Sequence, residues 1–66
     1  MGVKLLASSP TIEGIERMVN KYACSVDSYV VHVETLEIVN VKGFPVPKHW
    51  RIVKKGKRYR FESVRG

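Results

Sequence analysis

Six cations in the last part of the chain are the residues best suited to interact with a polyanion. They fall within a span of ten positions and are Arg51, Lys54, Lys55, Lys57, Arg58 and Arg60. Lysine and arginine side chains donate hydrogen bonds and carry positive charge, so a row of them along an extended segment can follow a phosphate backbone. We therefore expect these six residues to contact the phosphates of nucleic acid. Phosphate contacts carry no sequence information, so we expect little base readout.

One thiol and two histidines raise the questions of nucleophilic catalysis and metal binding. A thiolate nucleophile needs a nearby base, which His32 or His49 would supply to Cys24. Cys24, however, ends the apolar stripe of a predicted helix, where a free cysteine packs as a small hydrophobe. Asp27 would complete a mixed set of metal ligands, but the separations match none of the paired spacings of structural zinc sites. We expect no enzyme activity, no metal site and no cofactor.

Other catalytic or nucleotide-binding arrangements are not indicated. Glu34 and Glu37 lie around a predicted turn, and Glu13 and Glu16 lie on a solvated helix face, so neither pair is expected to do acid–base work. Gly56 stands among lysines without the further glycines that a phosphate-cradling loop needs. The single cysteine also excludes an internal disulfide.

The positive charge is concentrated in the second part of the chain. The 66 residues carry twelve Lys and Arg against six Asp and Glu, a net charge of +6. Residues 1–41 hold three basic and five acidic residues, whereas residues 42–66 hold nine basic residues and one acid, Glu62. This asymmetry favours a polyanionic or acidic partner, and a solubilising surface is the simpler alternative.

Chain length and hydropathy limit the architecture. A chain of this size buries only about 60% of its unfolded surface, so it builds a single two-layer core. Its apolar runs of two or three residues are far shorter than the roughly 18 to 20 needed to cross a bilayer. The start of the chain also lacks the apolar stretch of a secretory signal. We expect one domain over residues 1–66, located in the cytoplasm and without a membrane partner.

The cationic segment is predicted to form a β-hairpin. Its large apolar residues share one face if the loop between the strands has an even length; they are Trp50, Ile52, Tyr59 and Phe61. A turn of two or four residues centred on Lys55-Gly56 meets this condition, with Gly56 in the positive φ that such a turn requires. Ile52 then opposes Tyr59, and Trp50 opposes Phe61.

The other face of this hairpin is expected to be cationic. The same register places Arg51 opposite Arg60 and Val53 opposite Arg58, with lysines at the tip. The aromatic side chains therefore point away from the arginines. Because a small chain without disulfides or metals needs its largest apolar side chains inside, we expect the aromatic face to be core and not a stacking platform for bases.

An amphipathic helix is predicted in the first half of the chain. Ser9 is the expected N-cap, with Pro10 in the first helical position, where its missing N–H costs nothing. Apolar residues then recur at helical spacing and form the stripe expected to face the core: Ile12, Ile15, Met18, Val19, Tyr22 and Ala23. The opposite, mixed-charge face is expected to be solvated: Glu13, Glu16, Arg17, Asn20 and Lys21. Gly14 indicates either a marginal helix or a close approach by another group.

A second hairpin is predicted after the helix, where β-branched residues dominate. The expected register pairs Val33 with Leu36 across a Glu34-Thr35 turn, and it also pairs Val31 with Ile38. A four-residue loop beginning at Glu34 is the alternative, with shorter strands. The expected apolar face consists of Tyr29, Val31, Val33, Leu36 and Ile38.

Together these elements predict an α+β fold. One amphipathic helix packs on one face of a mainly antiparallel sheet of three to five strands that ends in the basic hairpin. The loop from Lys42 to Pro47 separates the two hairpins, and Val3 to Ala7 either adds a strand or frays.

The charge distribution then gives two hypotheses for function. The leading one is a small non-enzymatic module that binds DNA or RNA mainly through backbone phosphates. The alternative is a protein-interaction module whose basic face docks on an acidic protein surface. A homodimer is compatible with either, because the core is small and sheet edges offer a pairing surface.

Overall fold

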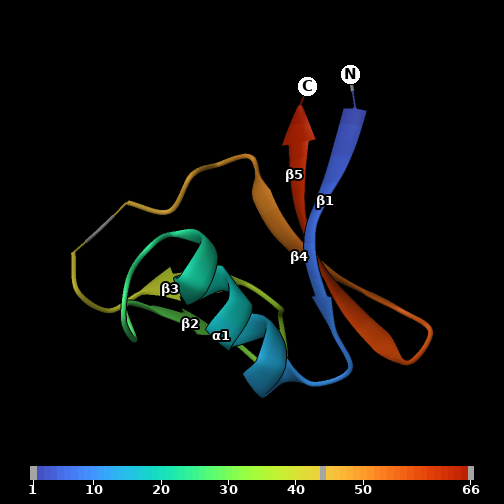
Figure 1. Cartoon of the computed structure of the whole chain (residues 1–66), viewed down its shortest axis with the longest axis horizontal. Coiled ribbons are helices and arrows are strands. Elements are labelled where there is room, and N and C mark those ends of the chain that lie inside the picture. Colours follow the sequence, from blue (N-terminus) through green and yellow to red (C-terminus); the bar gives the residue numbers. More distant parts are fainter. Residues whose placement is uncertain (1, 44, 66) are drawn as a thin grey trace.

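The part of the protein that the structure describes consists of one helix and five antiparallel strands arranged in two sheets (Figure 1). The computed structural model describes residues 2–43 and 45–65, so the predicted 42–47 loop includes one position outside the described residues. The elements in chain order are β1 (Gly2–Ser9), α1 (Ile12–Tyr22), β2 (Tyr29–Val31), β3 (Ile38–Asn40), β4 (Trp50–Lys55) and β5 (Arg58–Arg65). The predicted α+β class is thus confirmed.

The larger sheet has three strands in the order β1-β5-β4, with every neighbouring pair antiparallel. β1 pairs with β5 from Gly2 opposite Arg65 to Ser9 opposite Tyr59, so the start of the chain is a long strand and does not fray. Between Leu5 and Ala7 the register shifts in a β-bulge. The first and last strands of the chain therefore lie side by side, as Figure 1 shows.

The β4–β5 hairpin has the predicted faces but not the predicted pairs. Its two-residue turn is Gly56-Lys57, so Ile52 opposes Phe61 and not Tyr59. The remaining predicted pairs are replaced in the same way: Trp50 opposes Ser63, Arg51 opposes Glu62 and Val53 opposes Arg60. Gly56 has φ of +61° and stands first in the turn, the position that a type II′ turn reserves for glycine. Each partner moves by two residues, which leaves every side chain on its expected face.

The helix begins later than its sequence signal indicates. Thr11 is the N-cap, in extended conformation, and its Oγ1 accepts a hydrogen bond from the Gly14 N–H at 3.0 Å. Pro10 therefore precedes the cap and is not the first helical residue. Ser9, the predicted cap, instead accepts a hydrogen bond from the Thr11 N–H at 3.3 Å. Ser9 and Thr11 each accept a hydrogen bond from an N–H near the start of the helix, and the prediction of Ser9 as N-cap was two residues early.

Gly14 marks a close approach between the helix and the end of β1. A Cβ at this position would overlap Ser9 Oγ and lie 3.1 Å from Ser9 Cβ, and Ser9 is buried. Of the two readings of Gly14, the structure therefore supports close packing. The absent side chain lets the first turn of α1 rest against the chain that leads into it.

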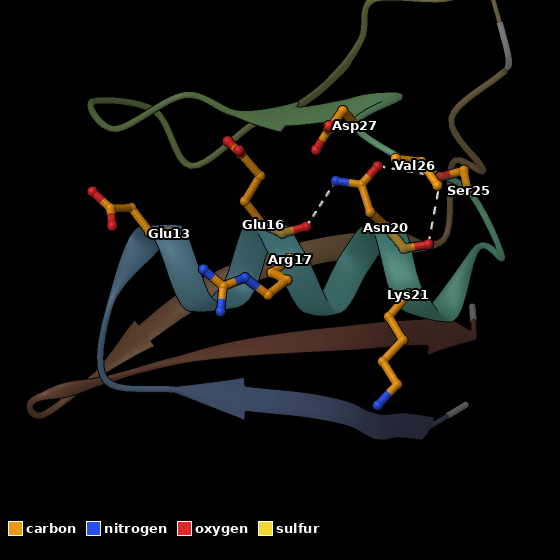
Figure 2. A pocket seen from close by; sticks show the side chains of 8 residues that line it. All are labelled: Glu13, Glu16, Arg17, Asn20, Lys21, Ser25, Val26 and Asp27. Carbon is orange, nitrogen blue, oxygen red and sulfur yellow. Dashed lines mark hydrogen bonds between the residues drawn. The ribbon is translucent and has the colours of Figure 1, made fainter.

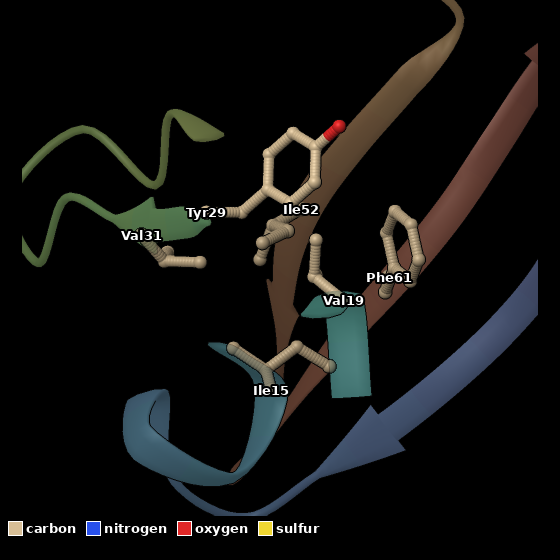
Figure 3. Close-up of a cluster of buried hydrophobic side chains, with 6 residues drawn as sticks. All are labelled: Ile15, Val19, Tyr29, Val31, Ile52 and Phe61. Carbon is tan, nitrogen blue, oxygen red and sulfur yellow. The ribbon is translucent and has the colours of Figure 1, made fainter. Parts of the chain in front are cut away.

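The core lies between α1, the larger sheet and β2 (Figure 3). Its buried hydrophobic residues come from all three: Ile15, Val19, Tyr29, Val31, Ile52 and Phe61. Of the predicted stripe, Ile12 and Ala23 are partly buried against this core, whereas Met18 is 38% exposed and Tyr22 is 51% exposed. α1 is therefore rotated so that the Ile15 and Val19 line faces Phe61, and Met18 and Tyr22 lie along its margin beside β1.

The β2–β3 hairpin keeps one predicted pair and loses the other. Val31 opposes Ile38 as expected, but each strand is only three residues long. Val33 does not pair with Leu36; it is 71% exposed, whereas Leu36 is partly buried against the core. The Leu36 N–H donates to the His32 carbonyl at 2.8 Å, and Leu36 has φ of +59°. The connection is therefore longer than the predicted two-residue turn.

The free edge of β2 is covered by polar side chains of α1. Asn20 Oδ1 accepts hydrogen bonds from the N–H groups of Ser28 and Tyr29, both at 2.9 Å, while its Nδ2 donates to the carbonyl of Tyr29 at 2.9 Å. Glu16 Oε2 accepts from the Val31 N–H at 3.1 Å. These side chains make the hydrogen bonds to backbone N–H and C=O groups that a neighbouring strand would otherwise make. The expectation of a solvated face was wrong for Asn20, which is 7% exposed.

Candidate nucleic-acid interface

The larger sheet has two faces with different surroundings. Ile52 and Phe61 point into the core, where α1 and β2 cover them (Figure 3). We call this the inner face. Because side chains alternate along a strand, the neighbours of these residues point to the opposite, outer face. On β4 and β5 the outer-face residues are Arg51, Val53, Lys55, Arg58, Arg60, Glu62 and Val64.

Five of the six residues predicted to bind phosphate lie on the outer face or at the hairpin tip. Arg51 and Lys55 come from β4, Arg58 and Arg60 come from β5, and Lys57 lies in the turn. Lys54 is the exception, because it belongs to the inner side of β4, with its Nζ 5.6 Å from the centre of the Tyr59 ring. The five other predicted residues thus lie together on the outer face and at the hairpin tip, whereas Lys54 lies on the inner side, away from the arginines.

A buried carboxylate lies among these arginines. Glu62 Oε1 accepts a hydrogen bond from Arg51 Nε at 3.1 Å, and its Oε2 accepts one from Arg60 Nε at 2.8 Å. The Glu62 side chain is 5% exposed, whereas those of Arg51 and Arg60 are 49% and 34% exposed. Each guanidinium is thus fixed through Nε. In the described part of the chain, no side chain or backbone group bonds to its terminal nitrogens, which remain accessible to a ligand.

The ionisation of Glu62 follows from this arrangement. Burial of the carboxylate acts to raise its pKa, and the hydrogen bonds and charges of Arg51 and Arg60 outweigh that effect and hold the pKa below its ordinary value of 4.5. Glu62 is therefore charged at neutral pH. Its negative charge offsets one positive charge on the outer face, and its two hydrogen bonds hold Arg51 and Arg60 in place.

Arg58 extends the cationic row toward the hairpin tip and ties it to β1. Its Nε donates to Ser8 Oγ at 3.1 Å, and Lys55 lies directly across from it on β4. Arg58, Arg60 and Glu62 are spaced two residues apart, which corresponds to about 6.6 to 6.8 Å along a strand. The outer face therefore presents charges at regular intervals along one direction.

The aromatic residues of the hairpin lie away from this row. Trp50 packs edge-to-face against Phe61, Tyr22 and Tyr29, with ring centres 5.2, 5.8 and 5.9 Å apart. These partners belong to the core or to α1, so Trp50 lies on the inner side. The predicted separation of aromatic and arginine faces is confirmed, and the outer face offers no aromatic ring among the described residues on which a base could stack.

The thiol and imidazole groups do not converge on a site. Cys24 is exposed, contrary to the expected packing, because it follows the last helical turn with φ of +55°. This left-handed conformation is common just past a helix end and turns the side chain away from the core. His32 and His49 are exposed, and within residues 2–43 and 45–65 no three potential ligands gather to hold a metal ion.

A shallow groove runs along the solvent side of α1 (Figure 2). Its charged residues are mixed in sign, with Glu13, Glu16 and Asp27 near Arg17 and Lys21. Glu16 is already engaged with the edge of β2. The groove therefore lacks the single sign of charge that distinguishes the outer face.

Two residues of the candidate interface were not predicted from sequence. Ser8 and Glu62 contact the arginines, yet neither was assigned a role. A signal for Glu62 was present, because the alternation that groups Arg58 with Arg60 also places Glu62 on their face. No local signal pointed to Ser8, because its contact joins residues 50 positions apart.

Comparisons with known proteins gave no match, whether to a protein-family model, a curated protein or a solved structure. α1, the helix found in the described residues, is too short and too polar to cross a membrane. The candidate interface therefore rests on the chain's own geometry and charge.

Proposed function

We propose that the protein is a small non-enzymatic module that binds nucleic acid through backbone phosphates on the outer face of β4 and β5. The observation that supports this proposal most strongly is the row of Arg51, Arg60 and Arg58 on a sheet face that neither α1 nor the smaller sheet covers. Lys55 and Lys57 extend the row to the hairpin tip. These residues would bind DNA or RNA without distinguishing base sequences.

The way the arginines are held suits contact with phosphate. Arginine offers a planar fork of donors that matches phosphate oxygens. Arg51 and Arg60 each use one edge of that fork, Nε, to bond Glu62, so the carboxylate orients both groups before a ligand arrives. Pre-orientation lowers the side-chain entropy that binding would otherwise cost.

The salt dependence of binding tests the proposal. Five cations offset by one carboxylate correspond to about three to four phosphate contacts, so log K should fall against log salt with a slope of about −3 to −4 on duplex DNA. Titration of a labelled duplex at several salt concentrations measures this slope. Competition by unrelated duplexes should give nearly equal affinities. No detectable binding at about 50 mM salt, or a flat salt dependence, would rule out the phosphate model.

A pair of matched double variants identifies the binding face. Arg58→Gln with Arg60→Gln removes two outer-face charges and should reduce the salt slope by up to about 2. Arg17→Gln with Lys21→Gln removes the same charge from exposed positions of α1 and should change the slope little. Equal loss in both variants would show that net charge, and not the outer face, controls binding.

The alternative function is docking of this basic face on an acidic protein surface. The experiment that separates the two is purification at low salt followed by the absorbance ratio at 260 and 280 nm. Co-purified nucleic acid, released by high salt, supports the proposed function. A nucleic-acid-free protein that brings down one defined acidic partner supports the alternative.

A further inference from the structure

We propose that the free edge of β1 is a dimer interface at which β1 of a second copy pairs antiparallel about a two-fold axis near Leu5. The two three-stranded sheets would then form one six-stranded sheet in the order β4-β5-β1-β1-β5-β4. This inference concerns a different surface from the proposed nucleic-acid face and does not depend on it.

The edge of β1 is long and little protected against pairing. β1 is the outermost strand of the order β1-β5-β4, and Figures 1 and 2 both show it at the margin of the sheet. One of its sides pairs with β5, and in the part of the chain that the structure describes nothing pairs with the other. Its eight residues include no proline and one charge, Lys4, whereas exposed edges usually carry such blocking residues.

Apolar side chains are exposed on both sides of this edge. On the outer side Val3 and Leu5 are 52% and 47% exposed. On the inner side Met18 and Tyr22 of α1 form, with Leu6 and Ala7 of β1, the apolar residues of a groove. A strand that adds to this edge must therefore carry apolar residues on both faces.

β1 itself is a strand of the required kind. Val3 and Leu5 lie on its outer face, and Leu6 and Ala7 lie against the groove. With the two-fold axis at Leu5, each Leu5 meets its counterpart on the outer face, and Lys4 lies beside Leu6 of the second copy. No like charges oppose each other in this register, and Met18 and Tyr22 of both copies approach across the axis.

The positive charge of the chain does not prevent this association. The two copies of β5 would be three strand spacings apart, about 14 Å, and the two copies of β4 still farther. The Debye length at physiological ionic strength is about 8 Å, so repulsion between the two cationic faces is largely screened. A small domain with few fully buried apolar residues also gains stability from such an interface.

The mass in solution tests the interface. Nucleic-acid-free protein should sediment with twice the chain mass of 7.5 kDa at high concentration and dissociate on dilution. Met18→Lys and Val3→Lys each place a charge in the contact and should weaken association by roughly 100-fold or more. The matched control is Val39→Lys on β3, at a position 37% exposed against 38% for Met18, and it should leave association unchanged.

Cross-linking tests the register. In a Cys24→Ser background, Leu5→Cys should form an intermolecular disulfide under mild oxidation, because directly opposed antiparallel residues have Cα atoms within disulfide range. Val39→Cys is the control and should form no intermolecular disulfide under the same oxidation. A 7.5 kDa species at every concentration would overturn the proposal, as would a dimer that Val39→Lys disrupts and Met18→Lys and Val3→Lys do not. Neither result would alter the salt-dependent binding expected of the outer face.

Discussion

The inner and outer faces of the larger sheet are built from the same two strands and differ in burial and charge. On the inner face Ile52 and Phe61 are 6% and 0% exposed and pack against α1 and β2. On the outer face Arg51 and Arg60 remain partly exposed and are organised around one carboxylate. The inner face thus contributes to stability, and the nucleic-acid binding that we propose would use the opposite face of the same hairpin. Substitutions on the two faces should consequently affect different measurements.

The largest expected effect is on the inner face. Phe61→Ala removes a fully buried ring that contacts Trp50 and Tyr22, and it should lower the free energy of unfolding by about 3 to 5 kcal/mol. Urea unfolding followed by circular dichroism measures the loss. The fraction that remains folded should bind a duplex with unchanged salt slope. A change in slope would break the separation between the two faces.

The next largest loss of stability is expected from the buried polar contact that Asn20 makes on the same side of the sheet. Asn20→Ala leaves the N–H groups of Ser28 and Tyr29 buried without their acceptor, at a cost of about 2 to 4 kcal/mol. Asn20→Asp keeps the acceptor but places an oxygen against the Tyr29 carbonyl, so it should also destabilise. Lys21→Ala, one position along and exposed, is the control. Equal unfolding midpoints for Asn20→Ala and Lys21→Ala would contradict the role of Asn20.

A pH-dependent contribution to stability is expected from the outer face. Because the pKa of Glu62 is lowered in the folded protein, its stabilising effect is complete above the ordinary value of 4.5 and is lost as pH falls through the lowered folded value. Thermal midpoints of the wild type and Glu62→Gln should therefore differ most near neutral pH, and the difference should shrink as the pH falls below 4.5 through the lowered folded pKa. A constant difference between the two would show that Glu62 acts by shape alone.

The smallest effect on stability is expected from the exposed Arg58. Arg58→Gln should leave the free energy of unfolding within about 1 kcal/mol of wild type, since this side chain lies at the surface and has no contact with Glu62. Trp50 emission provides a second readout. It should be blue-shifted in the native protein, unchanged in this variant and little quenched by oligonucleotide, because Trp50 lies on the inner side. Strong quenching on binding would show that the ligand binds the inner, aromatic side of the sheet and not the outer face.

The faces of the hairpins could be predicted from sequence because alternation with period two is a local property. Trp50, Ile52, Tyr59 and Phe61 kept their common side even though the turn moved by one residue. The exact partners depend on which residues form the turn, and one glycine in a lysine-rich segment did not fix that choice. The faces of the candidate interface were therefore predictable, and its Arg51–Glu62 contact was not.

Helix orientation could be predicted only in part, because it depends on the shape of the surface that the helix covers. The periodic stripe identified Ile15 and Val19 correctly and included Met18, which the larger sheet does not cover. Asn20 was assigned to solvent because it lies on the helix face opposite the apolar stripe. Its burial depends on the edge of β2, which lies nine positions away in sequence. A hydrogen bond between two separate elements of this kind leaves no periodic pattern in the sequence.

The pairing of β1 with β5 also determines the order in which the molecule can be assembled. During synthesis from the N-terminus, residues 2–9 emerge before residues 58–65 and have no strand partner in the larger sheet until those residues follow. α1 and the two hairpins depend on contacts between residues close in sequence, which form quickly, whereas joining the distant strands requires closure of most of the chain. The larger sheet is therefore completed last. Until then β1 is an apolar strand with both edges open, so the time before β5 arrives is when the nascent chain is most exposed to aggregation.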